Sequence, residues 1–209
     1  MMEICDNCNS EIEKDSVYCN KCGHKVNPSL LDNHVTLYSD FGGLSIPFNP
    51  LTFEYCFQIG INAYHKGDYY ESLEYDKKAV TFHNLDLREL SNCYNEIGCS
   101  YVKIGQRDKG IEYFQLAISA NPENKDSWMN LIAQQVSNDD NGAIENFKKM
   151  ESIIVDFDSR VWHLIGMAYE NLNRYDSAKK FYEEAIKNGY EKAKVDLDDV
   201  VRKISNLKM

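Results

Sequence analysis

A recurring 34-residue pattern constrains the fold of this chain more than any other feature of its sequence. Its clearest copy, residues 91–124, is SNCYNEIGCSYVKIGQRDKGIEYFQLAISANPEN. Apolar and small residues recur there at helical intervals on both sides of Gly105, and Pro122 ends the stretch. The pattern predicts two amphipathic helices joined by a turn. Because a pair of short helices cannot bury its apolar faces alone, the stretch also predicts neighbours of the same kind.

Three further copies supply those neighbours. Gly98, Ile132 and Gly166 hold equivalent places 34 residues apart, and Gly60 precedes Gly98 by 38 residues. The additional residues fall in the segment 82–88, which lengthens the link between the first two copies. We therefore predict four helix pairs, at about residues 53–86, 91–124, 125–158 and 159–192.

The period and the residues at its fixed places resemble the tetratricopeptide repeat, whose pattern is Trp-x2-Leu-Gly-x2-Tyr, then Ala-x3-Phe, then Pro. In the second copy these places hold Tyr94, Gly98, Tyr101, Phe114 and Pro122. The resemblance covers about residues 53–192 and implies a mainly α fold, a right-handed superhelical solenoid of helix pairs. It also implies a concave groove, lined by the first helix of each pair, that binds a peptide or helix of a partner protein.

Two copies depart from the family's pattern. The third has Ile132 where a small residue is usual, and its turn brings Ala143 forward by one place. We expect the two helices of that pair to be spread apart. The first copy has Asp76 where a large aromatic residue is usual and Ala63 where tyrosine is usual, and we expect the adjacent Tyr75 and Tyr64 to stand in for them.

The side chains that miss the core on the first helices follow a regular spacing and define a candidate partner site. Asparagine can hydrogen-bond an extended peptide backbone there, and methionine adapts to varied apolar side chains. The predicted partner-binding groove is lined by Tyr64, Asn92, Asn95, Cys99, Lys103, Met129, Arg160, His163 and Met167. One subgroup of the family grips a C-terminal carboxylate, but the basic and amide residues here do not follow its spacing, so we do not predict that mode.

Residues 191–209 are predicted to form one capping helix. One face of that helix holds the apolar residues Ala193, Leu197, Val200, Val201 and Ile204, and the opposite face is charged. A terminal helix with one polar side closes the exposed end of a solenoid.

The first 26 residues hold two Cys-x2-Cys pairs, Cys5 with Cys8 and Cys19 with Cys22, separated by a segment whose residues 10–15 are expected to turn. Each pair aims two thiolates at one point, and two pairs complete a tetrahedral sulfur shell for Zn²⁺. The alternative is two local disulfides or free thiols.

The same stretch resembles the short zinc-ribbon modules of many bacterial and archaeal proteins. We predict a zinc ribbon over 1–26 with one Zn²⁺. A closed four-sulfur site leaves no position for a reacting water, so the metal is expected to be structural. The segment 27–52 carries three of the four prolines and no helical period, and we interpret it as a connector.

Charge and composition argue against several classes of function. The net charge of −10 argues against binding nucleic acid and against anionic membrane surfaces. The sequence has no apolar run long enough to span a membrane and no secretion signal at its start, so we expect a cytoplasmic protein. It also lacks a glycine-rich phosphate loop and a paired acid–base motif, so we do not expect an enzyme.

These observations favour a non-enzymatic adaptor that binds a protein partner in its groove and carries a structural zinc ribbon. The alternative is a regulatory subunit whose zinc ribbon contacts nucleic acid or a nucleic-acid-associated complex.

Overall fold

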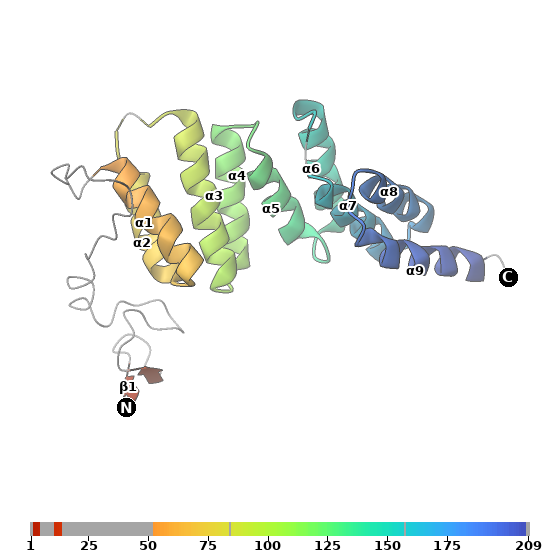
Figure 1. Ribbon diagram of the computed structural model, residues 1–209, viewed down its shortest axis with the longest axis horizontal. Helices are drawn as coiled ribbons and strands as arrows, with labels where there is room; N and C mark the ends of the chain where they lie inside the picture. The colour runs from red at the N-terminus through yellow and green to blue at the C-terminus, as the bar shows by residue number, and fades with distance from the viewer. Residues whose placement is uncertain (1, 5–10, 14–51, 84, 157, 208–209) are drawn as a thin grey trace. The chain divides into compact units, whose positions relative to one another are not determined.

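A computed structural model describes residues 2–4, 11–13, 52–83, 85–156 and 158–207 of the chain (Figure 1). The chain divides into two compact units, 1–51 and 52–209, which are described separately.

The described part of the first unit is a short antiparallel hairpin. Strand β1 (Met2–Ile4) pairs with β2 (Glu11–Glu13), and Ile4 lies opposite Glu11. The expectation of a turn over residues 10–15 was therefore wrong for Glu11–Glu13, whose backbone completes the ladder with β1. The four predicted zinc ligands and the connector up to residue 51 lie outside the described residues.

The second unit is built from helices in all its regular parts that the structure describes. They are α1 (Phe53–Lys66), α2 (Tyr69–Ala79), α3 (Leu87–Lys103), α4 (Arg107–Ala120), α5 (Lys125–Gln135), α6 (Asp140–Ile153), α7 (Arg160–Asn171), α8 (Tyr175–Lys187) and α9 (Ala193–Asn206).

Local chemistry sets where these helices begin. Asp86 starts α3 with a capping box, in which its carboxylate accepts from the amides of Arg88 and Glu89 while Glu89 accepts from the Asp86 amide. The side chains of Thr52, Asp68, Asn124 and Asp139 cap α1, α2, α5 and α6 in the simpler way.

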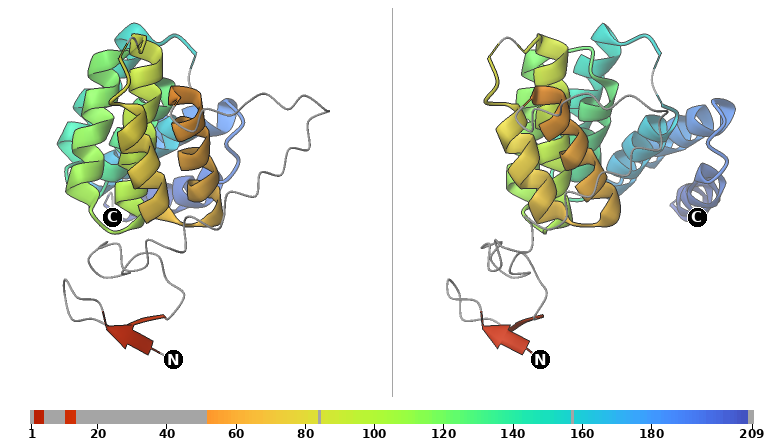
Figure 2. Two further views of the ribbon diagram at one scale, coloured as in Figure 1. Left: turned by 90° about the vertical axis from the view of Figure 1, so that its left-hand side faces the viewer. Right: turned by 60° about the vertical axis from the view of Figure 1, so that its left-hand side comes forward.

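The helices pack in chain order as pairs, α1 with α2, α3 with α4, α5 with α6 and α7 with α8 (Figures 1 and 2). The second helix of each pair packs on the first helix of the next pair, and α8 packs on α9. Contacts also join α1 to α3, α3 to α5 and α5 to α7, so the first helices lie side by side. The prediction of a mainly α array of stacked helix pairs is confirmed.

Glycine permits the close approach of the helices in the second and fourth pairs. A Cβ on Gly98 would lie 2.6 Å from Cε1 of the buried Phe114 ring, and a Cβ on Gly166 would overlap the buried Tyr182 ring in the same way. These rings fill the space between the two helices of their pairs.

In the first pair this arrangement is altered. Gly60 faces Asp76, which is fully buried, and a Cβ on Gly60 would overlap its carboxylate. The expectation that Tyr75 replaces the missing aromatic ring was wrong, because Asp76 itself occupies the place. Tyr75 instead packs edge-on against Tyr55.

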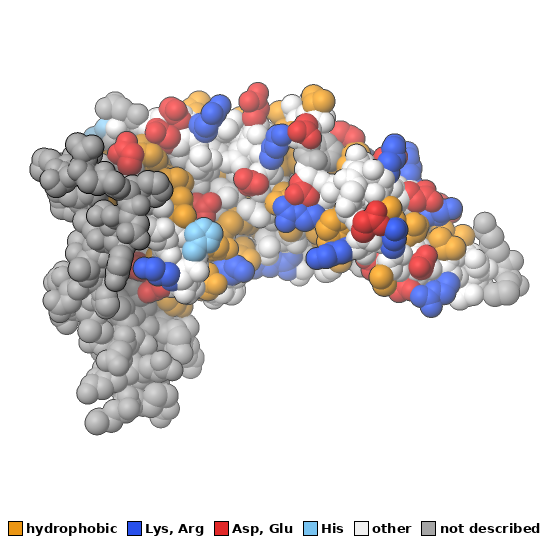
Figure 3. Space-filling model, viewed as in Figure 1, with side chains coloured by type: hydrophobic (Ala, Val, Ile, Leu, Met, Phe, Trp, Pro, Cys, Tyr) orange, Lys and Arg blue, Asp and Glu red, His pale blue; other side chains and the backbone are white. Residues whose placement is uncertain are grey.

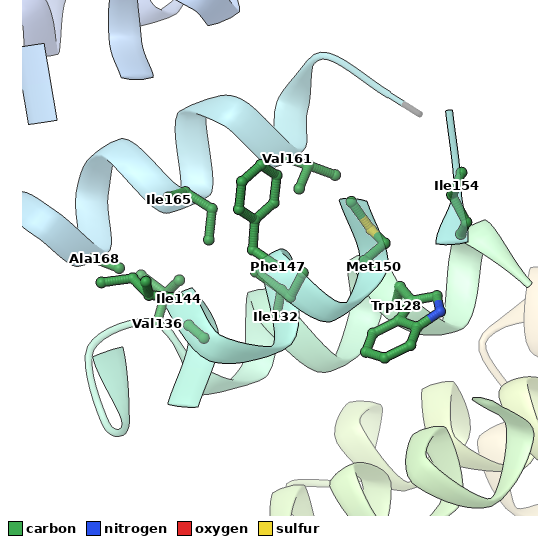
Figure 4. Close-up of a cluster of buried hydrophobic side chains, with 11 residues drawn as sticks. Trp128, Ile132, Val136, Ile144, Phe147, Met150, Ile154, Val161, Ile165 and Ala168 are labelled. Carbon is green, nitrogen blue, oxygen red and sulfur yellow. The ribbon is translucent and has the colours of Figure 1, made fainter. Parts of the chain in front are cut away.

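The third pair is held by a buried cluster that it shares with α7 (Figure 4). Ile132 is fully buried in this cluster, together with Phe147 and Met150 of α6 and Ile165 of α7. The branched side chain at the usual glycine place is therefore accommodated in an apolar cluster that keeps α5, α6 and α7 in contact.

Helix α9 covers the last pair with its apolar face. Ala193 and Val200 are fully buried against Ala178, Tyr182 and Ala185 of α8. The other side of the helix is polar or exposed, and Val201, which the sequence placed on the apolar face, is 40% exposed.

Ser137, in the turn between α5 and α6, has a left-handed backbone conformation that favours glycine. The turns between paired helices use left-handed residues, Gly67, Gly105, Ser137 and Asn173, and Ser137 has φ 74 without being glycine. A non-glycine residue there costs about 1 kcal/mol, so Ser137→Gly should raise the free energy of unfolding by roughly that amount. Urea denaturation followed by circular dichroism measures the change.

The matched control is Ser119→Gly, which lies within α4 on the exposed surface. Glycine is less favourable than serine in a helix, and Ser119 lies in the last turn of α4, so this variant should lose about 0.5 kcal/mol. Shifts of the same sign in both variants would contradict the assignment of strain to Ser137.

Candidate partner-binding face

The candidate site is the face formed by α1, α3, α5 and α7, here called the first-helix face. All nine residues predicted to line the groove belong to these four helices. Acidic, basic and apolar side chains are interspersed on the side of the molecule seen in Figure 3, with no large area of one charge sign.

The predicted residues differ in exposure. Asn92, Lys103 and Arg160 are exposed, and Tyr64, Cys99, Met129, His163 and Met167 are half-buried. Asn95 is buried, with 7% of its surface exposed. The structure therefore places eight of the nine where some part of the side chain reaches solvent, and Asn95 where almost none does.

Asn95 belongs to a hydrogen-bond network between α3 and α5. Its Oδ1 accepts from Ser127 Oγ at 3.2 Å and from Asn130 Nδ2 at 3.0 Å, and Asn130 Nδ2 also lies 3.4 Å from Cys99 Sγ. Because both acceptor bonds cross between repeats, the Asn95 side chain stabilises the contact of α3 with α5.

The Cys99 thiol is poorly reactive in this setting. Burial raises the pKa of its thiol to about 12, and the nearby Glu96 and Asp126 carboxylates act in the same direction. At neutral pH the side chain is therefore a thiol, and a nucleophilic thiolate is strongly disfavoured.

The two methionines are partly packed and partly open. Met129 on α5 and Met167 on α7 are both half-buried against the cluster shared by the third and fourth pairs. Their flexible thioether side chains provide an apolar surface that can adapt to a partner.

His163 is coupled to α9. Its Nε2 lies 2.7 Å from Asp196 Oδ2, and its ring lies beside the rings of Tyr182 and Tyr190. The neighbouring Arg160 pairs with Asp158 at 2.7 Å on the exposed surface. His163 therefore holds α9 to α7 as well as lining the first-helix face.

Tyr64 marks the N-terminal end of this face. Its ring packs against Tyr69 of α2, with ring centroids 5.4 Å apart, and burial raises the pKa of its hydroxyl to about 12. The Tyr64 hydroxyl therefore remains a hydrogen-bond donor throughout the physiological range.

Sequence reasoning missed a set of polar contacts that join one repeat to the next, or the last repeat to α9. Asn95 with Asn130, His163 with Asp196, and Glu170 with Lys203 are separated by 35, 33 and 33 residues. Since the period is about 34 residues, polar residues one period apart were the signal that could have found these contacts.

Comparison with known proteins agrees with this architecture. The tetratricopeptide repeat family matches residues 91–124 and 159–188, which are the second and fourth helix pairs. The sequence matches no curated protein.

Solved structures extend the likeness to most of the helical unit. A crystal structure of MamA is 28% identical with a TM-score of 0.60, covering 70% of this chain and 83% of that one. A second MamA crystal structure is 27% identical with a TM-score of 0.58, covering 69% and 77%. MamA from Desulfovibrio magneticus RS-1 shares the fold at 17% identity, with a TM-score of 0.62 and coverage of 72% and 85%.

The chain therefore contains tetratricopeptide repeats arranged in a fold like that of MamA. Such repeats are protein-interaction modules. Among the described residues, no helix is both long and apolar enough to cross a membrane.

Proposed function

We propose that this chain is a non-enzymatic adaptor that binds a peptide or helix of a partner protein on its first-helix face. The observation that supports this most is the side-by-side placement of α1, α3, α5 and α7. It gathers exposed polar groups such as Asn92 and Lys103 and the half-buried Met129 and Met167 on one continuous set of helices. Exposed amides and adaptable apolar groups together suit recognition of a polypeptide.

Site-specific photo-crosslinking tests the proposal. A photoreactive amino acid placed at Asn92 or Lys103 should crosslink a discrete partner in cells, because both positions are exposed on the first-helix face. The matched control position is Lys148, which is exposed on α6, the second helix of its pair. Equal crosslinking from Lys148, or crosslinking from Lys148 alone, would contradict the proposal.

We also propose that residues 1–26 form a zinc ribbon with Cys5, Cys8, Cys19 and Cys22 as ligands. The described hairpin supports this, because β1 ends at Ile4 and β2 begins at Glu11, so the first Cys-x2-Cys pair belongs to the segment that joins them. The four thiolates would hold one Zn²⁺, whose binding free energy would replace the hydrophobic core that so short a segment cannot build.

A further inference from the structure

The carboxyl group of Asp76 is buried, and only one of its two oxygens has a hydrogen-bond partner. The residue is fully buried on α2, and its Oδ2 accepts from Ser72 Oγ at 3.0 Å. Ser72 Oγ lies 2.9 Å from Ser100 Oγ of α3, so a chain of three polar groups connects the first repeat to the second. Oδ1 has no hydrogen-bond partner and lies against Gly60 of α1.

The groups around Asp76 do not compensate a negative charge. From α3, Glu96 adds a like charge, and the Cys93 and Cys99 thiols are held neutral by burial. The α2 lysines are engaged elsewhere, Lys77 with the Tyr101 hydroxyl and Lys78 with Glu74. On α1, His65 acts on the carboxyl group of Glu96 and lowers its pKa. The Cys56 thiol acts on the Lys78 ammonium group.

This environment raises the pKa values of both Asp76 and Glu96. The pKa of Asp76 is raised to about 7, mainly by burial; the hydrogen bond from Ser72 opposes this shift and the charge of Glu96 adds to it. Burial likewise raises the pKa of Glu96 above its ordinary value. A buried carboxylic acid costs far less free energy than a buried carboxylate, so the docked arrangement favours the protonated form.

We propose that the joint between the first and second repeats is a proton-sensitive device, in which a neutral Asp76 carboxyl keeps α1 and α2 docked on α3 and its ionisation loosens them. The device belongs to the free chain and does not require a partner. Its consequence for the first-helix face is that α1, with Tyr64, would be held firmly beside α3 at mildly acidic pH and less firmly at alkaline pH.

The direction of the pH dependence follows from the two pKa values. The pKa of Asp76 is about 7 in the docked state, against 3.8 for an ordinary aspartate, so the docked state holds its proton more tightly. The stabilisation is complete below pH 3.8 and is lost as the pH rises through 7. From pH 5 to pH 7, the equilibrium constant for opening should rise about fiftyfold in all.

Hydrogen exchange of the full chain, corrected for intrinsic exchange rates, tests the proposal. Amides of α1 and α2 should be about fiftyfold less protected at pH 7 than at pH 5, while those of α7 and α8 should change little. Asp76→Asn keeps the shape but cannot ionise, so it should remove most of the difference and leave only what Glu96 contributes. An unchanged pH dependence in Asp76→Asn, or equal loss in both regions, would overturn the proposal.

A second measurement needs no variant. Carboxyl carbon NMR of the wild-type chain should show Asp76 titrating near pH 7, and titration near pH 4 would overturn the proposal even if Asp76→Asn failed to fold.

Discussion

Phe114→Ala should lower the free energy of unfolding of the helical unit by about 3–5 kcal/mol, because it empties the space between α3 and α4. The Phe114 ring is 1% exposed, and it lies directly against Gly98. Urea denaturation measures the loss. Leu116→Ala is the matched control on the same helix, because Leu116 is 46% exposed and should cost less than about 1 kcal/mol. Similar losses in the two variants would contradict the packing described for this repeat.

The contact of Gly98 with Phe114 also predicts coupling between the two positions. Gly98→Ala alone should destabilise the chain by about 1–3 kcal/mol, because the new methyl group would lie too close to the ring and to the Gly110 carbonyl. In the Phe114→Ala background the ring is gone, so the same change should cost much less. A double-mutant cycle measures this coupling, and simple additivity would contradict the proposed steric origin.

Zinc removal should have the second large effect, confined to the N-terminal unit. Two three-residue strands are not stable alone in water, and structural zinc in small modules supplies about 10–16 kcal/mol of apparent binding free energy. A chelator should therefore unfold residues 1–26, observed as loss of the hairpin's NMR signals. Helical circular dichroism should persist, because the described residues contain no group of three potential metal ligands.

Two cysteine variants separate the ligands from the other thiols. Metal analysis should find one zinc per chain in the wild type and none after Cys5→Ser, while Cys56→Ser should keep its zinc because Cys56 is buried in the helical unit. Zinc retained in Cys5→Ser, or a chain isolated without zinc but with two disulfides, would show that the ligand assignment is wrong.

The helix pairs could be predicted from the sequence because the packing of each pair places similar residues at fixed intervals. Gly98 with Phe114 and Gly166 with Tyr182 repeat the same contact, so their spacing is visible without a structure. Asp76 breaks the pattern visibly, but its burial could not be predicted. Whether an aspartate at an apolar place turns outward or stays inside depends on its neighbours, here Ser72 of its own helix and Ser100 of the next.

The candidate site was predictable as a set of helices and less so as a set of side chains. Helical spacing assigned Asn95 and His163 to the first-helix face, but their exposure depends on residues in the following helices. Asn95 is covered by its bonds to Ser127 and Asn130, and His163 by Asp196. A spacing rule that treats each helix alone cannot include such contacts between helices.

That a protein partner binds the first-helix face is a claim that calorimetric titration of the crosslinked partner segment can test directly. Lys103→Glu reverses an exposed charge on α3, and Lys148→Glu makes the same change on α6. Thermal unfolding would first establish that both variants are folded like the wild type. We expect Kd to rise at least about tenfold for Lys103→Glu, a loss of about 1.4 kcal/mol, and to stay within about twofold of the wild type for Lys148→Glu. An unchanged Kd for Lys103→Glu together with weakened binding for Lys148→Glu would contradict the claim.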